Sequence, residues 1–583
     1  MNPRPKKTLA DLLIDYLAQL SVDFVFGIPG GAIEPLYNAL ALSMRNSGPR
    51  PILARHETGA AFMADGYYRQ TGKLGVCCAT TGPGATNLLT GVASAYENRI
   101  PLLVITAQTA LSLFGKGAFQ ESSCTGINTV SLFGHCTRLS SLVSHPNQFE
   151  PKLINAVMTA FRSPAGPTHL SIPWDILGGP APVDQPSYSL PALLNRDRSF
   201  DPGTLDQLVQ EIVRARKSVL VVGAGCGEAV EPIATLALKL NAALVATPQG
   251  KGFVDPYHPL FRGIIGFAGH ASARAALTDP DVDTVIGIGS NFSEWASNAW
   301  DEGALLNERL IHVDSDADHF ARSPNARLHV HGNIAAIVAH VLDRLADARP
   351  SASSRVRPGL SAREAMGLEL DEAVKSHSPA QPIKPQALMR ELANLFPPST
   401  CFLADTGNSQ AWSVHYLHPR WEQGHPRGWT DARYHCAFEF ASMGWAIGAA
   451  VGMALGARGE QPIVCITGDG SLLMSGQELT VAVQERLPVI FVLLNDAALG
   501  MVKHGQRRAG SEAVAFELPA IDYATYAQAL GAYGQVIHAL DDLRALDVPA
   551  LCRRPGPTLL DVRIDAEEAP PIGMRTRVLG AER

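Results

Sequence analysis

Uninterrupted apolar runs, separated from one another by helix-like stretches, constrain this fold more than any other feature of the sequence. Four examples lie at residues 101–106, 218–223, 284–289 and 488–494. These runs do not alternate apolar with polar residues, as expected for parallel strands covered on both faces. Strands that alternate with helices predict an α/β fold of doubly wound parallel sheets.

Two stretches interrupt this alternation and predict linkers. Residues 178–195 are rich in Pro, and residues 348–383 begin with a run of Ser, Pro and Arg; neither is periodic. The chain of 583 residues therefore divides into three expected domains, at residues 1–180, 195–347 and 383–570.

Composition narrows the function classes. The formal net charge is −7, without the basic stripe of a nucleic-acid protein, so no nucleic-acid partner is expected. No apolar run reaches the ~18 residues of a membrane span, and no signal peptide is evident. The longest candidate, residues 444–456, is rich in Gly and Ala and predicts a buried helix. The nine cysteines are scattered without a Cys-x-x-Cys pair, which indicates neither a disulfide framework nor a zinc site. A reducing, cytoplasmic setting is expected.

The strongest chemical signal is Gly468-Asp469-Gly470-Ser471, which directly follows the strand-like residues 462–467. A helical pattern follows at residues 476–485. A second strand-like run then ends at Asn495-Asp496, 26 to 27 residues beyond Asp469. The carboxyl ends of parallel strands share one sheet edge, where ligands bind. Carboxylate and amide oxygens suit Mg²⁺, and the glycines let a phosphate approach the backbone. A lone Gly-Asp-Gly would favour a turn without a ligand. The Asn495-Asp496 pair at this spacing instead favours a ligand-binding site.

The first third of the chain carries four further segments. They are residues 26–32 (FGIPGGA), 55–61 (RHETGAA), 81–87 (TGPGATN) and 118–121 (AFQE). The first is a Gly-rich loop after a strand-like run, and the second and third each open a helical pattern.

Taken together, these segments resemble the thiamine-diphosphate enzymes, and most closely acetolactate synthase and its relatives. The motifs follow in the same order over nearly the whole chain, and the resemblance is weakest in the middle third. It is closest at RHETGAAFMADGYYR, TGPGATNLLTG, GAFQE and the segment from Gly468 to Asp496. The resemblance implies an N-terminal pyrimidine-binding domain, a central domain and a C-terminal diphosphate-binding domain, with thiamine diphosphate and Mg²⁺ as cofactors.

The resemblance also assigns roles. Glu57 would bond to the pyrimidine ring of a cofactor held by the partner subunit, so a homodimer or homotetramer is expected. A partly desolvated carboxylate there would promote the tautomer that activates the cofactor. Without the surrounding motifs, Glu57 would be interpreted as an acidic residue that the helix dipole favours at a helix N-terminus. For the metal, the resemblance implies Asp469, Asp496 and the carbonyl of Ala498, with Asn495 as the alternative ligand.

The remaining site residues are implied by the same motifs. Beside Glu57, those expected near the reacting atoms are Gln120, Phe119 and Gly31. Those expected to hold the cofactor are Pro29, Gly82, Asn87, Thr406, Gly407, Asn408, Ala441, Met443, Gly468, Gly470, Ser471, Gly500 and Met501. Met443 alone would more often be a core residue than a wedge under a cofactor.

Two departures from acetolactate synthase concern the second substrate. Gly505 stands where the family has a Trp, so an aromatic wall of about 150–250 Å² is missing. The pocket is then wider, or Lys503 and His504 fill it. The residues 290–295 (SNFSEW) lack an Arg that in the family contacts flavin and substrate. Gly223 to Gly227 form only a weak Gly-rich signal, so a structural FAD stays open.

The function that follows is thiamine-diphosphate-dependent decarboxylation of a 2-oxo acid, pyruvate being the first candidate, and carboligation of the activated aldehyde to a second carbonyl compound. The alternatives are a simple 2-oxo-acid decarboxylase, another acyl transferase of the same family, or a non-catalytic paralogue that only binds the cofactor. Retention of Glu57, Gln120 and Asp469 argues against the last.

Overall fold

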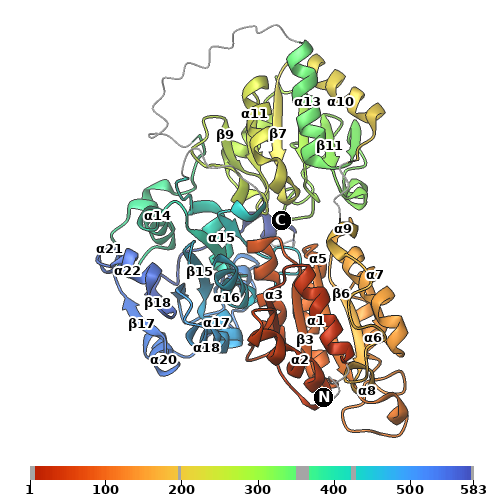
Figure 1. Cartoon of the computed structure of the whole chain (residues 1–583). Coiled ribbons are helices and arrows are strands. Elements are labelled where there is room, and N and C mark those ends of the chain that lie inside the picture. The colour runs from red at the N-terminus through yellow and green to blue at the C-terminus, as the bar shows by residue number, and fades with distance from the viewer. Residues whose placement is uncertain (1–6, 195–198, 349–366, 422–428, 579–583) are drawn as a thin grey trace.

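A computed structural model describes residues 7–194, 199–348, 367–421 and 429–578 of the chain. It contains three six-stranded sheets in which every strand pair is parallel, with helices on both sides (Figure 1). The four apolar runs singled out in the sequence are the strands β4 (Leu102–Gln108), β7 (Ser218–Val222), β10 (Thr284–Ile288) and β16 (Val489–Asn495). The predicted α/β fold of doubly wound sheets is confirmed.

The first sheet has the order β2-β1-β3-β4-β6-β5. Its other strands are β1 (Phe24–Gly27), β2 (Arg50–Leu53), β3 (Gly75–Ala79), β5 (Leu139–Leu142) and β6 (Thr168–Pro173). Its helices are α1 (Leu9–Gln19), α2 (Glu34–Arg45), α3 (Glu57–Thr71), α4 (Pro83–Asn87), α5 (Leu89–Glu97), α6 (Thr129–Gly134), α7 (Phe149–Phe161), α8 (Trp174–Leu177) and α9 (Leu190–Leu193).

The central sheet has the order β12-β11-β10-β7-β8-β9. Its other strands are β8 (Ala243–Ala246), β9 (Phe261–Ile264), β11 (Leu310–Asp314) and β12 (Leu328–His331). Its helices are α10 (Pro202–Arg214), α11 (Val230–Leu240), α12 (Ala271–Thr278) and α13 (Ile334–Ala348).

The third sheet has the order β14-β13-β15-β16-β18-β17. Its other strands are β13 (Cys401–Ala404), β14 (Tyr434–His435), β15 (Ile463–Gly468), β17 (Tyr533–Ile537) and β18 (Thr558–Arg563). Its helices are α14 (Pro385–Leu395), α15 (Asn408–Tyr416), α16 (Trp445–Ala457), α17 (Asp469–Ser475), α18 (Leu479–Gln484), α19 (Gly500–Arg508), α20 (Tyr523–Ala529), α21 (Leu540–Arg544), α22 (Val548–Arg553) and α23 (Gly573–Val578).

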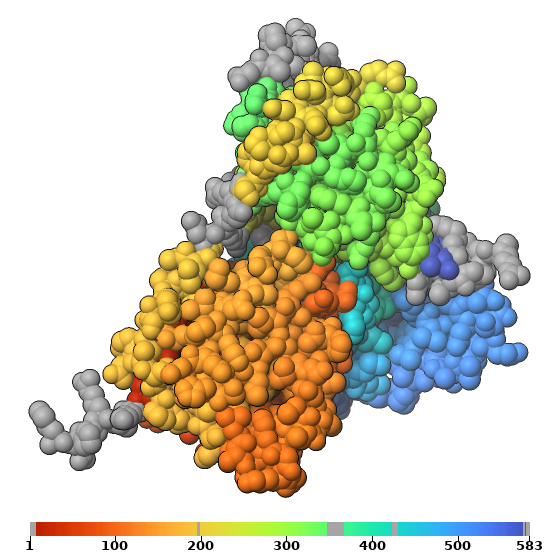
Figure 2. Space-filling model, turned by 90° about the vertical axis from the view of Figure 1, so that its right-hand side faces the viewer, coloured from red at the N-terminus to blue at the C-terminus, as the bar shows by residue number. Residues whose placement is uncertain are grey.

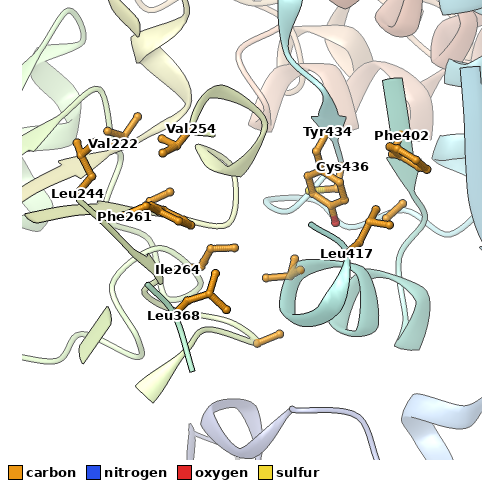
Figure 3. Packing of buried hydrophobic residues seen from close by; sticks show 14 of the residues in the cluster. Val222, Leu244, Val254, Phe261, Ile264, Leu368, Phe402, Leu417, Tyr434 and Cys436 are labelled. Atoms are coloured by element: carbon orange, nitrogen blue, oxygen red, sulfur yellow. The ribbon is translucent and has the colours of Figure 1, made fainter. Parts of the chain in front are cut away.

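The central domain sits across the other two, which lie side by side (Figures 1 and 2). One buried apolar cluster continues from the central domain into the C-terminal domain. Figure 3 shows Val254 and Ile264 of the former facing Leu417 and Tyr434 of the latter. A second cluster joins the N-terminal and C-terminal domains around α3 and α16. The domains therefore share cores rather than touching only at their surfaces.

The contact between α3 and α16 depends on glycine. A Cβ on Gly66 would lie 2.0 Å from the carbonyl oxygen of Ala449, and one on Gly452 would lie 1.9 Å from that of Met63. A Cβ on Gly448 would lie 2.7 Å from Cβ of Phe62. Because these distances are far inside van der Waals contact, the two helices approach backbone to backbone only where no side chain intervenes. The buried helix expected near residues 444–456 is α16.

Two sequence-based expectations concern connecting segments. Residues 178–194 form loops and the short α9, whereas residues 349–366 of the second predicted linker lie outside the described residues. The helical pattern expected at residues 476–485 is a 3₁₀ turn, η9 (Gly476–Glu478), followed by α18. A further helix that was not expected, α17, already begins at Asp469. In the part of the chain that is described, no helix combines the length and apolar character needed to cross a membrane.

Candidate active site

Two acidic side chains meet at the carboxyl edge of the third sheet. Asp469 follows β15 directly and is 2% exposed, and Asp496 follows β16, the adjacent strand. Loss of hydration raises the pKa of Asp469 to about 6. The pKa of Asp496 is raised to about 7, first by loss of hydration and then by the negative charge of Asp469. Two buried carboxylates that raise each other's proton affinity in this way could together hold a cation.

The orientation of Asp469 supports the same interpretation. One oxygen, Oδ1, accepts a hydrogen bond of 2.8 Å from the Gly470 amide, whereas Oδ2 is buried without a partner. The amide of Asn495 instead donates to Asp561 Oδ1 at 2.8 Å. This bond engages only the nitrogen of the Asn495 amide, so the oxygen of Asn495 and the carboxylate of Asp496 both remain candidate ligands.

Glycines keep the space beside these carboxylates open. A Cβ on Gly500 would lie 2.3 Å from Asn408 Nδ2 and 2.8 Å from Asp496 Oδ2, so these two side chains converge on Gly500. A Cβ on Gly470 would lie 3.3 Å from Cε of Met443. Buried side-chain oxygens of Asn408 and Ser471 also lack hydrogen-bond partners. Close backbone approach and unpartnered polar atoms are what a bound diphosphate requires.

The other implied cofactor contacts lie around this cradle. Thr406 and Gly407 connect β13 to α15, and Gly468 ends β15. Met501, in the first turn of α19, is partly buried against the cluster shared with the central domain.

The turn that contains Ala441 and Met443 is held by a residue that the sequence analysis did not assign. Asp405 is fully buried and accepts hydrogen bonds from the backbone amides of Gly444 at 2.9 Å and Ala446 at 3.3 Å. It thereby caps the N-terminus of α16, while Ala441 adopts a positive φ of 54°. Asp405 adjoins a segment singled out by motif, but only the fold shows which amides it meets.

A second group of predicted residues meets at the carboxyl edge of the N-terminal sheet. Glu57 is the first residue of α3, is 8% exposed, and accepts a 3.0 Å hydrogen bond from Asn87 Nδ2. Gly82 lies against Gln120: a Cβ there would be 3.0 Å from Cβ of Gln120. Thr81 ties the two segments through a 2.9 Å bond from its hydroxyl to the Gln120 carbonyl. The structure thus brings Glu57, Asn87, Gly82 and Gln120 to one edge.

Glu478 is a further residue that sequence reasoning missed. This buried side chain of η9 accepts a 2.9 Å hydrogen bond from the His56 amide and bonds of 3.2 Å from the Arg55 amide. Burial raises the pKa of Glu478 to about 7. A Cβ on Gly59 would lie 2.3 Å from its Oε1, so Gly59 admits the carboxylate. The C-terminal domain therefore fixes the start of the helix that carries Glu57.

Some predicted residues are not drawn into either group. Phe119 is 86% exposed. Gly31 lies in the short turn η1 (Gly31–Ile33) beyond Pro29, and a Cβ on it would meet nothing within 4 Å. In the single chain, no hydrogen bond or ion pair between described residues joins Glu57 to Asp469. Within one subunit, the group around Glu57 and the group around Asp469 are therefore not joined by such a contact.

The expectation that Lys503 could fill the acceptor pocket is wrong. Its ammonium group donates to the Ala566 carbonyl at 3.0 Å and to Glu567 at 2.8 Å, which directs it towards the C-terminal segment. His504 is buried and its Nε2 has no partner. A Cβ on Gly505 would meet nothing within 4 Å, so the space left by the missing aromatic side chain is open.

Two glycines of the Gly-rich turn in the central domain, Gly223 and Gly225, bond to neighbouring backbone. The amides of Gly223 and Gly225 donate to the carbonyls of Ile288 and Gly289 at 2.9 and 2.8 Å. A Cβ on Gly223 would lie 2.2 Å from the Gly289 oxygen, so these glycines serve packing of the chain on itself. Asp314, the last residue of β11, is buried, and its Oδ2 lies 3.1 Å from His319 Nδ1. The amides of Gly223 and Gly225 and the carboxylate of Asp314 are therefore engaged within the domain.

The described residues contain no cluster of three or more His, Cys, Asp or Glu side chains that could hold a metal ion without other ligands. A cation between Asp469 and Asp496 would therefore need backbone and phosphate oxygens as well, which is the mixed oxygen coordination that Mg²⁺ accepts. The donor set fits a metal diphosphate better than a free ion.

Sequence comparisons agree with this arrangement of fold and site. Residues 7–127 match the thiamine pyrophosphate enzyme N-terminal TPP binding domain, residues 205–341 the central domain and residues 405–562 the C-terminal TPP binding domain. The chain belongs to the thiamine pyrophosphate enzyme family. It is an enzyme dependent on that cofactor, as the sequence analysis predicted.

Within this family the chain resembles acetolactate synthase. It is 31% identical to the acetolactate synthase of Arthrospira platensis, over 96% of this chain and 95% of that one. It is 30% identical to the large subunit of acetolactate synthase isozyme 2 of Escherichia coli, over 96% of each. The fold is also that of the thiamine diphosphate-dependent 4-hydroxybenzoylformate decarboxylase of Rhodococcus jostii RHA1, with a TM-score of 0.79, 21% identity, and coverage of 97% of this chain and 100% of that one.

Proposed function

We propose that this enzyme decarboxylates a 2-oxo acid, pyruvate being the first candidate, and joins the activated aldehyde to a second carbonyl compound. The observation that carries the proposal is a pair of edge sites. One is a buried Glu57 bonded to Asn87, and the other is the pair of carboxylates Asp469 and Asp496, whose pKa values are raised, beside a glycine cradle. The similarity to acetolactate synthases over nearly the full length supports the same reaction.

The C-terminal group is proposed to hold the cofactor's diphosphate through Mg²⁺. Asp469, Asp496 and the Ala498 carbonyl would bind the metal. Asn408, Gly470, Ser471 and Gly500 would face the phosphate oxygens, and the turn from Ala441 to Met443 would face the pyrimidine. Bound thiamine diphosphate supplies the electron sink for the pair released when a 2-oxo acid loses CO₂.

Glu57 is proposed to hold a proton at its carboxylate oxygen opposite the pyrimidine nitrogen. Asn87 donates a hydrogen bond to its side chain, and Glu478 holds the backbone of residues 55–56 just before it. A carboxyl group that is held in place and largely out of water can pass a proton to a ring nitrogen efficiently. Gln120 and Phe119 are proposed to border the substrate on the same side.

Two subunits would complete each site. Phe119 is 86% exposed, and Leu473 and Met474, four and five residues after Asp469, are 46% and 54% exposed. Apolar side chains exposed beside both halves of a site mark a surface that a partner covers. We propose a homodimer, or a tetramer of two such dimers, in which Glu57 of one subunit serves the cofactor held by the other.

The test is product analysis by NMR with thiamine diphosphate, Mg²⁺ and pyruvate, alone and with a panel of aldehydes and ketones. A new carbon–carbon bond supports the proposal. Acetaldehyde as the only product would instead identify a 2-oxo-acid decarboxylase. If none of a panel of 2-oxo acids is consumed, the proposed reaction is wrong and the non-catalytic alternative stands.

The role of Glu57 is tested by Glu57→Gln, which keeps the shape and removes the acid. Turnover should fall by about 10² to 10⁴-fold, while the affinity for thiamine diphosphate measured by calorimetry changes little. Glu97→Gln, at the exposed end of α5, is the matched control and should behave as the wild type. Wild-type turnover by Glu57→Gln would remove Glu57 from the mechanism.

A further inference from the structure

Lys251 of the central domain is buried against the end of a helix of the C-terminal domain. It follows β8, begins the 3₁₀ turn η5 (Lys251–Phe253) and is 7% exposed. Its side-chain nitrogen Nζ donates hydrogen bonds to the carbonyls of Ser413 at 2.6 Å and Val414 at 2.8 Å. Both carbonyls lie in the last turn of α15, where the helix dipole is negative and favours a cation. Lys251 therefore places a basic group at the C-terminal end of α15.

The backbone beside Lys251 fixes this placement. The Gly252 carbonyl accepts a 3.0 Å hydrogen bond from the Arg433 amide. A Cβ on Gly252 would lie 2.3 Å from the Tyr434 carbonyl oxygen, so the two domains approach this closely only at a glycine. The Lys251 nitrogen lies 5.1 Å from the centre of the Tyr434 ring, whose face attracts a cation. The amino group is thus held between β14 and the end of α15.

No carboxylate of the described ranges forms an ion pair with Lys251. Burial, and to a smaller extent the charge of Lys251, lowers the pKa of His270, His415 and His418, so these neighbouring rings are neutral. Burial also lowers the pKa of Lys251 well below its ordinary 10.5. A buried amino group of this kind is more readily charged when a negative charge compensates it.

The opposite end of α15 carries the proposed diphosphate contacts. The helix begins at Asn408, after Gly407, which has a φ of 118° and no side chain to cap the first amides. The side chain of Asn408 has a buried oxygen without a hydrogen-bond partner. A Cβ on Gly500 would meet both Asn408 Nδ2 at 2.3 Å and Asp496 Oδ2 at 2.8 Å, so Asn408 lies beside a proposed metal ligand. The nine residues of α15 span ~13 Å and link Lys251 to the diphosphate cradle.

We infer that Lys251 is a positioning residue for the cofactor, because its charge at one end of α15 strengthens the binding of a metal-bound diphosphate at the other end. The inference rests on the proposed function, which places the diphosphate beside Asn408. The helix dipole acts in the same direction, since its negative end faces the ammonium group and its positive end faces the phosphates. The coupling is reciprocal: the anion favours the charged form of Lys251, and that form favours the anion. The central domain therefore contributes to cofactor affinity through a helix of another domain.

The size of the effect follows from the length of α15. Two unit charges ~13 Å apart, at an effective dielectric constant of ~20, change a binding constant by roughly tenfold. Because Lys251 is buried, salt screens this attraction much less than it screens an attraction between surface charges.

The test is calorimetric binding of thiamine diphosphate with Mg²⁺ to the cofactor-free full chain, in low and in high salt. Lys251→Met removes the charge and keeps the length of the side chain, whereas Lys251→Gln also keeps a hydrogen-bond donor. We expect both variants to bind the cofactor about tenfold more weakly, by a factor that salt hardly changes. The Tm of the cofactor-free variants should stay the same or rise, because replacing a buried charge by an uncharged side chain is often neutral or stabilising.

Lys239→Met is the matched control. Lys239 is an exposed lysine of the central domain that also donates to a helix carbonyl, that of Leu342 in α13, at 3.4 Å. Because α13 carries none of the proposed cofactor contacts, this variant should bind the cofactor as the wild type does. Inorganic diphosphate with Mg²⁺ is the second probe, and its affinity should fall by the same factor in both Lys251 variants, since the effect acts on the phosphates.

Wild-type affinity for thiamine diphosphate in Lys251→Met or Lys251→Gln would overturn the inference, and so would an equal loss in Lys239→Met. A lower Tm of both cofactor-free Lys251 variants would assign Lys251 to stability and would also overturn it. If both variants lose affinity while the wild type consumes no 2-oxo acid, the inference stands and only the proposed reaction fails. A wild-type chain that binds neither thiamine diphosphate nor inorganic diphosphate would overturn both.

Discussion

The glycine contact between α3 and α16 provides the sharpest structural test, through Gly452→Ala. The new Cβ would lie 1.9 Å from the Met63 carbonyl oxygen, whereas ordinary contact begins at 3.4 Å. The two helices must therefore separate by about 1.5 Å, and the obstacle is backbone, which cannot rotate away. Every side chain around this contact is buried, so the separation loosens a shared core.

The magnitude follows from two opposing effects. Overpacking of a filled core costs about 1–3 kcal/mol, and a clash with backbone belongs at the upper end. Alanine favours a helix interior over glycine by up to about 1 kcal/mol. The net loss of stability should be about 2 kcal/mol, which corresponds to a fall in Tm of roughly 2 °C when the whole chain unfolds as one unit.

The assay is thermal unfolding followed by circular dichroism, with Gly505→Ala as the matched control. Gly505 lies inside α19, and a Cβ there meets nothing within 4 Å, so this variant should be as stable as the wild type or slightly more stable. Because Glu57 begins α3 and the cofactor turn precedes α16, Gly452→Ala should also weaken binding of thiamine diphosphate. An unchanged Tm in Gly452→Ala would refute the argument that these glycines set the helix distance.

Two further predictions concern buried charges. Asp65 is fully buried, pairs with Arg69 and accepts a 3.1 Å hydrogen bond from Trp445 Nε1. Asp65→Asn should therefore lower the free energy of unfolding by about 3–5 kcal/mol and shift the Trp fluorescence. A loss under ~1 kcal/mol in urea unfolding would contradict the pairing. The folded pKa values of Asp469, about 6, and Asp496, about 7, lie above the ordinary 3.8. These carboxyls therefore favour the metal-free fold most below pH ~4, and this contribution is lost as the pH rises through 6 to 7. Mg²⁺ with thiamine diphosphate should then raise Tm more at pH 8 than at pH 5.5, and an equal rise at both would exclude these carboxylates as ligands.

The secondary structure was predictable wherever one local pattern was unambiguous. The apolar runs at 218–223 and 284–289 became β7 and β10 to within a residue, because a strand buried on both faces has nowhere to place polar side chains. The helical pattern at 476–485 corresponds to η9 and α18, but α17 was not predicted, because the turn after β15 is so short that α17 starts at Asp469 itself. No periodicity marks such an abrupt change.

The candidate site divides in the same way. Glu57, Asp469 and the glycines around them were recognisable because phosphate, metal and proton transfer need particular residue types at short, repeated spacings. Asp405, Glu478 and Glu439 carried no such signal. Each acts on groups that are distant in the sequence, such as Glu478 on the amides of residues 55–56, and a lone acidic residue in a helix or loop is most often on the surface.

The sequence alone determined the class of fold, the family and the chemistry of the cofactor edge, because these depend on short patterns of apolar, glycine and acidic residues. Only the tertiary structure decided how the domains share their cores, that Lys503 turns away from the site, and that Glu439, just before the cofactor turn, bonds to the central domain. Glu439 bonds to side chains more than a hundred residues away in the sequence, and Lys503 bonds to Glu567, some sixty residues away. Charge and hydrogen bonding act through distance in space, which the order of residues along the chain does not state.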